Sequence, residues 1–480
     1  MVLQPFPRST PEEQGIASTS ITSFLGAIAE QRLELHSFML VRNGHVVSEG
    51  WWDPYGPDMP HILYSLTKTF MATAIGLAAQ EGLLSLEDTA ASYFPERLPE
   101  QPSERLLRIR VKDLLMMGTG QTGDTIPQGA EDWIAAFFAK PVEAEPGTKF
   151  AYHSGASNML AAILERASGE TLDRFLQTRL FGPLGIEGEQ WDLLPDGSVP
   201  GGYGLRLKTE DIAKLGQLYL QKGIWNGERL LTEQWVSEAI GKQIDNGPNP
   251  NPDWASGYGY QIWRCARDNA YRFIGMFNQL CLVLPEHNAL VVTTSGLTDE
   301  AAVLDAIWEH LVPAMQERAV DRDVEAGRQL AETIGRLGLM PEIESLRVSP
   351  GKIMDPVSYK LGENPFGWET FSVESEENRL TLTVQLAGKE RQTVSVRPEG
   401  WIYGEFEREP IASVGGWKED GSLYIHTYFV STPYCRITTF EFEEDRVTLH
   451  LTGNVGMPEP VVIQGKRLEG VPATGDAGRD

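Results

Sequence analysis

The hydrophobic periodicity of this sequence changes near residue 356, and that change limits the folds available to the chain. Before it, runs with apolar residues at helical spacing alternate with strand-like runs. After it, short stretches alternate apolar and polar residues, with turn residues between them. A chain of 480 residues is also longer than one typical domain. We therefore predict two or three domains, the last of which is an all-β barrel or sandwich.

The first part of the chain is predicted to be an α+β domain with an antiparallel sheet. Two strand-like runs within 37–52 are joined by Asn43-Gly44, the pair that two-residue type I′ turns favour. Two further strands lie within 280–296, and runs of helical periodicity at 19–33 and 298–315 lie outside these strands in the sequence. Helices are therefore expected to flank the sheet.

The middle of the chain is rich in helical runs with polar starts, which indicates a helical subdomain inserted into the sheet domain. The predicted domains follow from these changes of pattern. We place the sheet domain at 1–315 with its helical subdomain at about 80–250, a helical linker at 316–345, the all-β domain at 346–470 and a disordered tail at 471–480.

The composition argues against several classes of partner. The chain has 41 Lys and Arg against 67 Asp and Glu, a formal charge of -26, which disfavours nucleic acid and anionic membrane surfaces. No apolar run is long enough to span a membrane, and no signal peptide is evident, so we expect a cytoplasmic protein. Three scattered cysteines and eight scattered histidines form no ligand motif, so no metal or other cofactor is expected.

A lysine stands where a buried helix face is predicted to begin. Ser65 and Lys68 are three positions apart in YSLTKTF, one helical turn on the same face. Burying an ammonium group costs several kcal/mol unless it is paired or neutral. A desolvated lysine with a lowered pKa can act as the base that activates a serine. The structural alternative is a helix-capping serine beside a solvated lysine.

The same spacing occurs a second time and serves as a control. Ser349 and Lys352 also match the pattern, but Pro350-Gly351 between them prevents a helix. We interpret this copy as a linker turn, so spacing alone does not identify a site.

A second segment supports the interpretation of Ser65 and Lys68 as a catalytic pair. It is PGTKFAYHSGASNMLAAILERASG at 146–169. Together the two segments resemble the serine β-lactamase and penicillin-binding-protein superfamily, in its class C and family VIII esterase branch. Residues 109–120 and 201–227 are also similar to this family, and the resemblance extends in order over about 10–312. The resemblance implies a β-lactamase-like fold for this part.

The resemblance also implies roles for four residues. Ser65 would be the nucleophile and Lys68 its partner on the next turn, while Tyr152 would carry the proton to the leaving group. Ser154 would line the site and donate a hydrogen bond to Lys68 or to the substrate. Coupled lysine and tyrosine groups titrate as a unit, so the base is not assigned to one of them. The alternative is a packed tyrosine and a capping serine.

The third motif of this family is altered. The family carries Lys-Thr-Gly, His-x-Gly or Trp-x-Gly on the strand beside the site, whereas this sequence has Phe273-Ile274-Gly275. The backbone N–H of Met276 would form the oxyanion hole with that of Ser65. Phe273 would then offer an apolar wall, which favours an uncharged substrate, although a strand core residue is an equal alternative. Arg272 is expected to face the other way.

From these patterns and this resemblance we expect a cofactor-independent serine hydrolase that acts on small esters or amides through an acyl-enzyme. Two alternatives remain open. One is a D-amino-acid peptidase or β-lactamase with an altered third motif. The other is a binding or regulatory protein on the same scaffold, with the β domain as its interaction module.

Overall fold

The computed structural model describes residues 5–123, 132–267, 269–341, 346–348, 357–376, 378–457 and 459–468. The chain forms two units, which we describe separately. The α+β unit comprises residues 1–51 and 57–336, and the β unit comprises residues 52–56 and 337–480. The predicted tail at 471–480 and the second Ser-x-x-Lys sequence at 349–352 lie outside the described residues.

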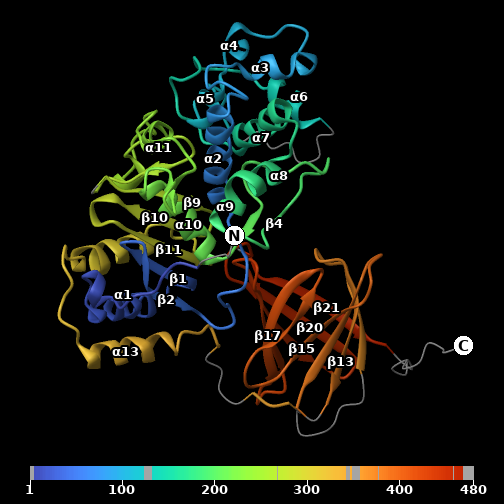
Figure 1. Cartoon of the computed structure of the whole chain (residues 1–480). Coiled ribbons are helices and arrows are strands. Elements are labelled where there is room, and N and C mark those ends of the chain that lie inside the picture. Colours follow the sequence, from blue (N-terminus) through green and yellow to red (C-terminus); the bar gives the residue numbers. More distant parts are fainter. Residues whose placement is uncertain are drawn as a thin grey trace, which may run out of the picture. The chain divides into compact units, whose positions relative to one another are not determined.

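The α+β unit is built on a six-stranded sheet whose neighbouring strands are all antiparallel, as predicted (Figure 1). The predicted hairpin turn is present, because Asn43 and Gly44 have φ angles of 51° and 73°. The order across the sheet is β2 (His45–Trp51), β1 (Leu35–Arg42), β11 (Ala289–Ser295), β10 (Gln279–Leu284), β9 (Tyr271–Gly275) and β8 (Trp263–Arg264).

Both faces of this sheet are covered, and the side chains of β1 show how. Met39 and Val41 enter the large core cluster on the side of α10 (Thr209–Leu220), which packs on β1, β10 and β11. Phe38 points to the opposite face and packs against Phe24 of α1 (Ser18–Glu30), with ring centroids 5.0 Å apart. The eight consecutive buried residues of β1 reflect this two-sided burial.

The segment 316–345, which we predicted as a helical linker, is divided between the two units, and its residues up to 336 belong to the α+β unit. Its helix α13 (Val324–Ile334) packs against α1, with Ala326 and Leu330 buried in the contact. Two apolar residues four positions apart are enough to dock one side of this otherwise charged helix.

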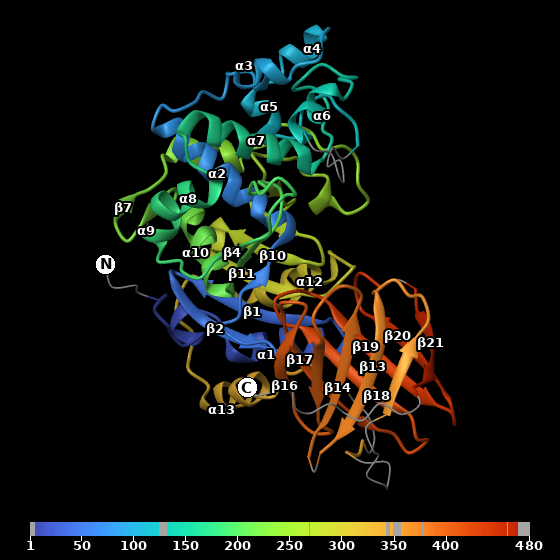
Figure 2. The same cartoon turned by 90° about the vertical axis from the view of Figure 1, so that its right-hand side faces the viewer.

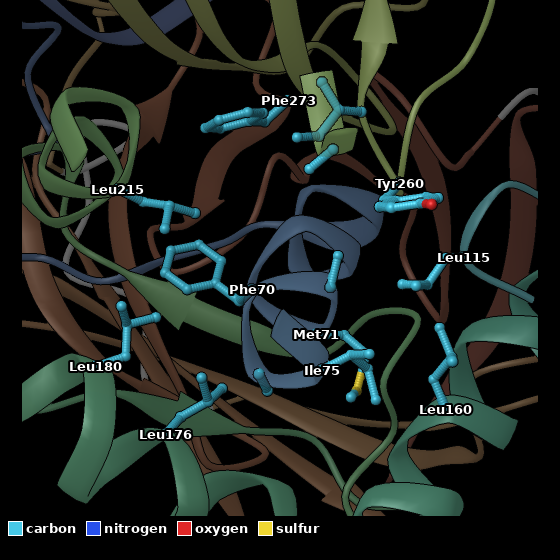
Figure 3. Close-up of a cluster of buried hydrophobic side chains, with 14 of the residues drawn as sticks. Phe70, Met71, Ile75, Leu115, Leu160, Leu176, Leu180, Leu215, Tyr260 and Phe273 are labelled. Atoms are coloured by element: carbon cyan, nitrogen blue, oxygen red, sulfur yellow. The ribbon is translucent and has the colours of Figure 1, made fainter. Parts of the chain in front are cut away.

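The helical part of the α+β unit surrounds α2 (Thr67–Gln80), which is buried along almost its whole length. Figure 3 shows Phe70 of this helix together with side chains from the elements around it, among them Leu176, Leu215 and Phe273. The other helices of this part are α3 (Ala90–Tyr93), α4 (Glu104–Leu107), α5 (Val111–Leu115), α6 (Trp133–Ala139), α7 (Ser154–Ser168), α8 (Leu172–Leu176), α9 (Gly182–Leu184) and α11 (Glu233–Ile240), and α12 (Ala302–Ala306) follows the sheet.

The β unit is a nearly closed antiparallel barrel (Figure 2). Its ten strands follow one another in a meander, and the edge strands β15 and β16 are neighbours in space. Aromatic and aliphatic side chains fill the interior. The strands are β12 (Val357–Leu361), β13 (Trp368–Ser375), β14 (Leu380–Leu386), β15 (Gln392–Val396), β16 (Ile402–Phe406), β17 (Glu409–Trp417), β18 (Leu423–Phe429), β19 (Cys435–Phe442), β20 (Arg446–Gly453) and β21 (Val461–Arg467).

Candidate active site

The predicted nucleophile lies in a tight turn that leads into a buried helix. Ser65 is the middle residue of a 3₁₀ turn, Tyr64–Leu66, and α2 starts at the next residue. Tyr64 has a φ angle of 46°, a left-handed conformation that is unusual for a bulky residue and that is often found at functional sites. Lys68, in the first turn of α2, is 1% exposed, and its Nζ lies 3.0 Å from the Oγ of Ser65.

Two further oxygen atoms surround the amine of Lys68. Its Nζ lies 3.2 Å from the Oγ of Ser154, at the start of α7, and 2.7 Å from the carbonyl oxygen of Gly202. The sequence predicted Ser154 for this place but not Gly202, which is 134 positions away from Lys68. The only signal for Gly202 was its place within the family-like segment 201–227.

The segment that carries Gly202 is held against α7 at close range. Asn158, one turn after Ser154 and 3% exposed, accepts a hydrogen bond from the N–H of Gly202 at 3.0 Å. A Cβ on Gly201 would lie 2.2 Å from the carbonyl oxygen of Ser157, so only glycine allows this approach. Helix α7 therefore orients Lys68 directly through Ser154 and indirectly through Asn158 and Gly202.

Tyr152 lies beside Lys68 in an aromatic environment. The Nζ of Lys68 is 5.0 Å from the centroid of the Tyr152 ring. On its other sides this ring packs against Trp263 at 5.8 Å and Tyr258 at 6.3 Å, two residues that no sequence motif indicated. Burial raises the pKa of Tyr258 well above its ordinary value, so this phenol stays neutral. Trp263 is half-buried, so part of its side chain remains accessible beside Tyr152.

The end of strand β9 lies directly against the turn that contains Ser65. A Cβ on Gly275 would be 2.0 Å from the carbonyl oxygen of Leu63 and 3.1 Å from the backbone nitrogen of Leu66. Met276 begins the following turn, and the buried amide of Gln279 donates to the carbonyl oxygen of Met276 at 3.1 Å. This close approach places the backbone of the altered third motif next to the predicted nucleophile.

One known protein family matches most of the α+β unit. The sequence model of the family described as Beta-lactamase matches residues 25–312, which is more than half of the chain. The chain belongs to the Beta-lactamase family.

Two relatives of this family member are named as hydrolases of different substrates. It is 24% identical to the 6-aminohexanoate-dimer hydrolase of Paenarthrobacter ureafaciens over 259 residues, 48% of this chain and 64% of the relative. It is 27% identical to the lovastatin esterase of Penicillium rubens over 165 residues, 28% of this chain and 40% of the relative. The matches therefore span less than two thirds of either relative.

A solved structure of a protein named SurE resembles both units of this Beta-lactamase family chain. The match has a TM-score of 0.51 and 18% sequence identity, and it covers 86% of this chain and 97% of SurE. At this identity the likeness shows a shared fold. Because the α+β unit makes up less than 86% of the chain, the match extends into the β unit.

Within this Beta-lactamase family chain, Phe273 does not form the predicted apolar wall. Its side chain is fully buried and packs on Tyr219 of α10, with ring centroids 5.5 Å apart, in the cluster around α2 (Figure 3). The prediction is therefore wrong for this residue, because α10 covers that face of β9 and removes the side chain from any substrate. Arg272 faces the other way, as expected, and donates to the carbonyl oxygen of Asp253 at 2.8 Å.

The two histidines next to the motifs are engaged in other parts of the fold. The Nε2 of His61 lies 3.0 Å from the Nδ1 of His36, and the Nε2 of His153 lies 3.1 Å from the Oγ1 of Thr119. In the described ranges, no three His, Cys, Asp or Glu side chains converge as metal ligands would. Among the helices described, none is long and apolar enough to cross a bilayer.

Proposed function

We propose that this chain is a serine hydrolase that cleaves small uncharged esters or amides through an acyl-enzyme on Ser65. The observation that carries the proposal is the set of three oxygen atoms within 3.2 Å of the buried Nζ of Lys68, one of which is the Oγ of Ser65. A buried amine in contact with a serine hydroxyl is the arrangement that a lysine base requires.

These three oxygen atoms suit both protonation states that a base must adopt. The carbonyl oxygen of Gly202 can only accept, whereas the serine hydroxyls can accept or donate. In the neutral state, two N–H groups of Lys68 donate to Gly202 and Ser154, and the lone pair accepts from the hydroxyl of Ser65. In the protonated state, the third N–H donates to the Oγ of Ser65. Lys68 thus takes the proton without losing a partner.

The remaining steps use groups that surround Ser65. As its Oγ attacks the carbonyl carbon, the substrate oxygen becomes an oxyanion that the backbone N–H groups of Ser65 and Met276 stabilise. The proton then passes through Lys68 and Tyr152 to the leaving group, and the acyl-enzyme forms as that group departs. A water molecule activated by the same pair hydrolyses the acyl-enzyme.

The aromatic surface next to Tyr152 supports an uncharged substrate. Trp263 offers an apolar face there, and the position at which the family carries a cation is filled by the buried Phe273. A substrate carboxylate would therefore lose a charged partner, which costs more than the loss of an apolar contact. Of the two relatives, the lovastatin esterase has a name that fits an ester substrate, whereas a dimer of 6-aminohexanoate still carries a carboxylate, so only the first name supports an uncharged substrate.

Fluorophosphonate labelling followed by intact mass measurement tests the proposal. We expect one adduct on the wild type, none on Ser65→Ala and slow labelling of Lys68→Ala. Ser349→Ala is the matched control, since Ser349 has the same Ser-x-x-Lys spacing, and it should label like the wild type. Folded wild-type protein without an adduct would overturn the proposal and favour a binding role.

Substrate turnover separates the esterase or amidase from its closest alternatives. We expect p-nitrophenyl acetate and small anilides to be hydrolysed faster, relative to their uncatalysed rates, than nitrocefin or D-alanyl-D-alanine peptides. Faster turnover of the carboxylate-bearing substrates would instead assign β-lactamase or D-amino-acid peptidase activity to the same serine.

A further inference from the structure

Three cations form a row across adjacent strands on the outer face of the β unit. Lys360 on β12 is directly opposite Lys466 on β21, and Lys466 is directly opposite Arg446 on β20. All three side chains are exposed and alternate with buried neighbours along their strands. We call Lys360, Lys466 and Arg446 the cationic row. They line a cavity of about 450 Å³.

This arrangement is unfavourable without a counter-ion. Like charges directly opposite on neighbouring strands repel and destabilise a sheet. The chain has carboxylates in excess, and other cations of the β unit use them, such as Lys389 with Glu407. Among the described residues, Lys360 and Lys466 have no carboxylate within 4.0 Å, and Arg446 reaches only Asp445, at 4.0 Å.

The other polar residues of the cavity indicate the kind of anion. Glu443 also lines it, so three positive charges and one negative charge leave a net charge of +2. Thr448 and Gln464 add neutral hydrogen-bond donors from the next row of the same face. A phosphate monoester carries about -1.5 to -2 charges at pH 7, which matches this net charge. Glu443 can accept a hydrogen bond from a hydroxyl group of such a ligand.

We propose that the cationic row binds the phosphate monoester group of a hydroxylated molecule. Lysine and arginine side chains are the usual partners of phosphate oxygens, and three in one row can contact different oxygens of the same group. The site lies entirely within the β unit and stands independently of the hydrolase proposal.

Calorimetric titration of the full-length protein with glycerol 1-phosphate at constant ionic strength tests this site. We expect glycerol 1-phosphate to bind the wild type saturably. Glycerol, which lacks the phosphate group, is the control ligand and should not bind. Lys466→Gln, which removes the central cation, should weaken binding at least tenfold, as should Lys360→Gln. Lys389→Gln is the matched control and should bind like the wild type. Absent binding, or equal binding by Lys466→Gln, overturns the proposal.

Thermal stability gives a second readout with a definite sign. In phosphate-free buffer, Lys466→Gln should raise the melting temperature because it relieves repulsion, and glycerol 1-phosphate should stabilise only the wild type. A lower melting temperature of Lys466→Gln in phosphate-free buffer would mean that the protein itself neutralises the row, which also overturns the proposal.

Sedimentation with vesicles identifies the source of the phosphate group. Binding to vesicles that contain phosphatidic acid, but not to pure phosphatidylcholine vesicles, assigns a lipid headgroup. Binding to glycerol 1-phosphate without vesicle binding assigns a soluble phosphate ester.

Discussion

At the scale of single residues, the activity of the site depends on the orientation of the Lys68 amine. Ser154 contacts it directly, whereas Asn158 acts through the N–H of Gly202, whose carbonyl oxygen lies 2.7 Å from the Nζ. Asn158 is thus a positioning residue that no catalytic motif includes.

Replacing Asn158 tests this indirect role. Asn158→Leu removes the acceptor for the N–H of Gly202. The carbonyl oxygen of Gly202 then moves, and the amine of Lys68 is no longer held in its orientation toward Ser65. A displacement of about 1 Å can lower a rate by about 100-fold. We expect kcat/KM for p-nitrophenyl acetate to fall about 10- to 100-fold. Asn158→Asp keeps an oxygen acceptor and adds a negative charge, so it should retain more activity and shift the acidic limb of the pH profile to higher pH.

Equal activity of Asn158→Leu and the wild type would contradict the indirect role. A loss of activity without any change of pH profile in Asn158→Asp would point to a purely structural effect.

At the scale of elements, strand β9 and the Ser65 turn meet without space for a side chain. Gly275 is required there because a Cβ would overlap the carbonyl oxygen of Leu63. The same strand buries Phe273 under α10 and Arg272 on the other face. The function of β9 at the site is therefore carried by its backbone.

Gly275→Ala should separate β9 from the Ser65 turn. The oxyanion donors would move apart, and we expect fluorophosphonate labelling to slow by roughly 100-fold while the far-UV circular dichroism is unchanged. Gly26→Ala is the control, because a Cβ at that position in α1 meets nothing within 4 Å. Labelling of Gly275→Ala at the wild-type rate would show that β9 contributes nothing to the reaction.

The sheet also contains a buried histidine that makes folding sensitive to acid. Burial lowers the pKa of His36, on β1, from 6.5 to about 3, so the folded protein keeps this ring neutral. The unfolded chain binds the proton below pH 6.5, and the stability from the neutral ring is lost progressively as the pH falls from 6.5 toward 3. At pH 5 the loss is about 2 kcal/mol.

Urea unfolding at pH 7 and pH 5 checks this effect. His36→Asn should lose about 2 kcal/mol less than the wild type between these values, because its side chain does not titrate. His45→Asn, on the neighbouring strand, is the comparison and should behave like the wild type. Many carboxylates also change the free energy of unfolding between pH 7 and pH 5, but they do so equally in all variants. The quantity to compare is therefore the difference between variants. An unchanged pH dependence in His36→Asn would refute the prediction.

At the scale of the whole molecule, the chain enters the β unit twice. Residues 52–56 belong to that unit although they follow β2 in the sequence. Tyr55 is buried there, donates to the carbonyl oxygen of Thr432 at 2.9 Å and packs edge-to-face against Tyr428, with ring centroids 5.8 Å apart. The N–H of Leu339 donates to the carbonyl oxygen of Asp53 at 2.7 Å. A fragment that starts at residue 337 would lack this short segment.

Tyr55→Ala should therefore destabilise the β unit rather than the α+β unit. Removing a buried aromatic side chain costs about 3 kcal/mol. Hydrogen exchange measured by mass spectrometry should accelerate in peptides from β17 and β18 and stay unchanged in β9 to β11. Tyr403→Phe, which removes only a hydroxyl that donates to Pro54, should have a much smaller effect. Faster exchange only in the six-stranded sheet of the α+β unit would contradict the assignment of residues 52–56 to the β unit.

Local patterns in the sequence determined a large part of this protein. Hydrophobic periodicity and turn residues within short segments predicted three features. These are the hairpin at Asn43-Gly44, the antiparallel α+β sheet and the alternating strands of the β unit. The proximity of Ser65 and Lys68 was predictable for the same reason, because three helical positions bring two side chains to one face. Tyr152 and Ser154 were predicted from the resemblance to a family.

Only the tertiary structure decided the contacts between distant segments. The carbonyl oxygen of Gly202 contacts Lys68 across 134 positions, Asn158 supports Gly202 across 44 positions, and Trp263 packs on Tyr152 from a separate strand. The burial of Phe273 was decided by α10, and the docking of α13 by α1, because strand alternation gives two faces without saying what covers each. A side chain's neighbours along the chain limit its direction, but the element that packs on it decides whether it meets substrate, solvent or core.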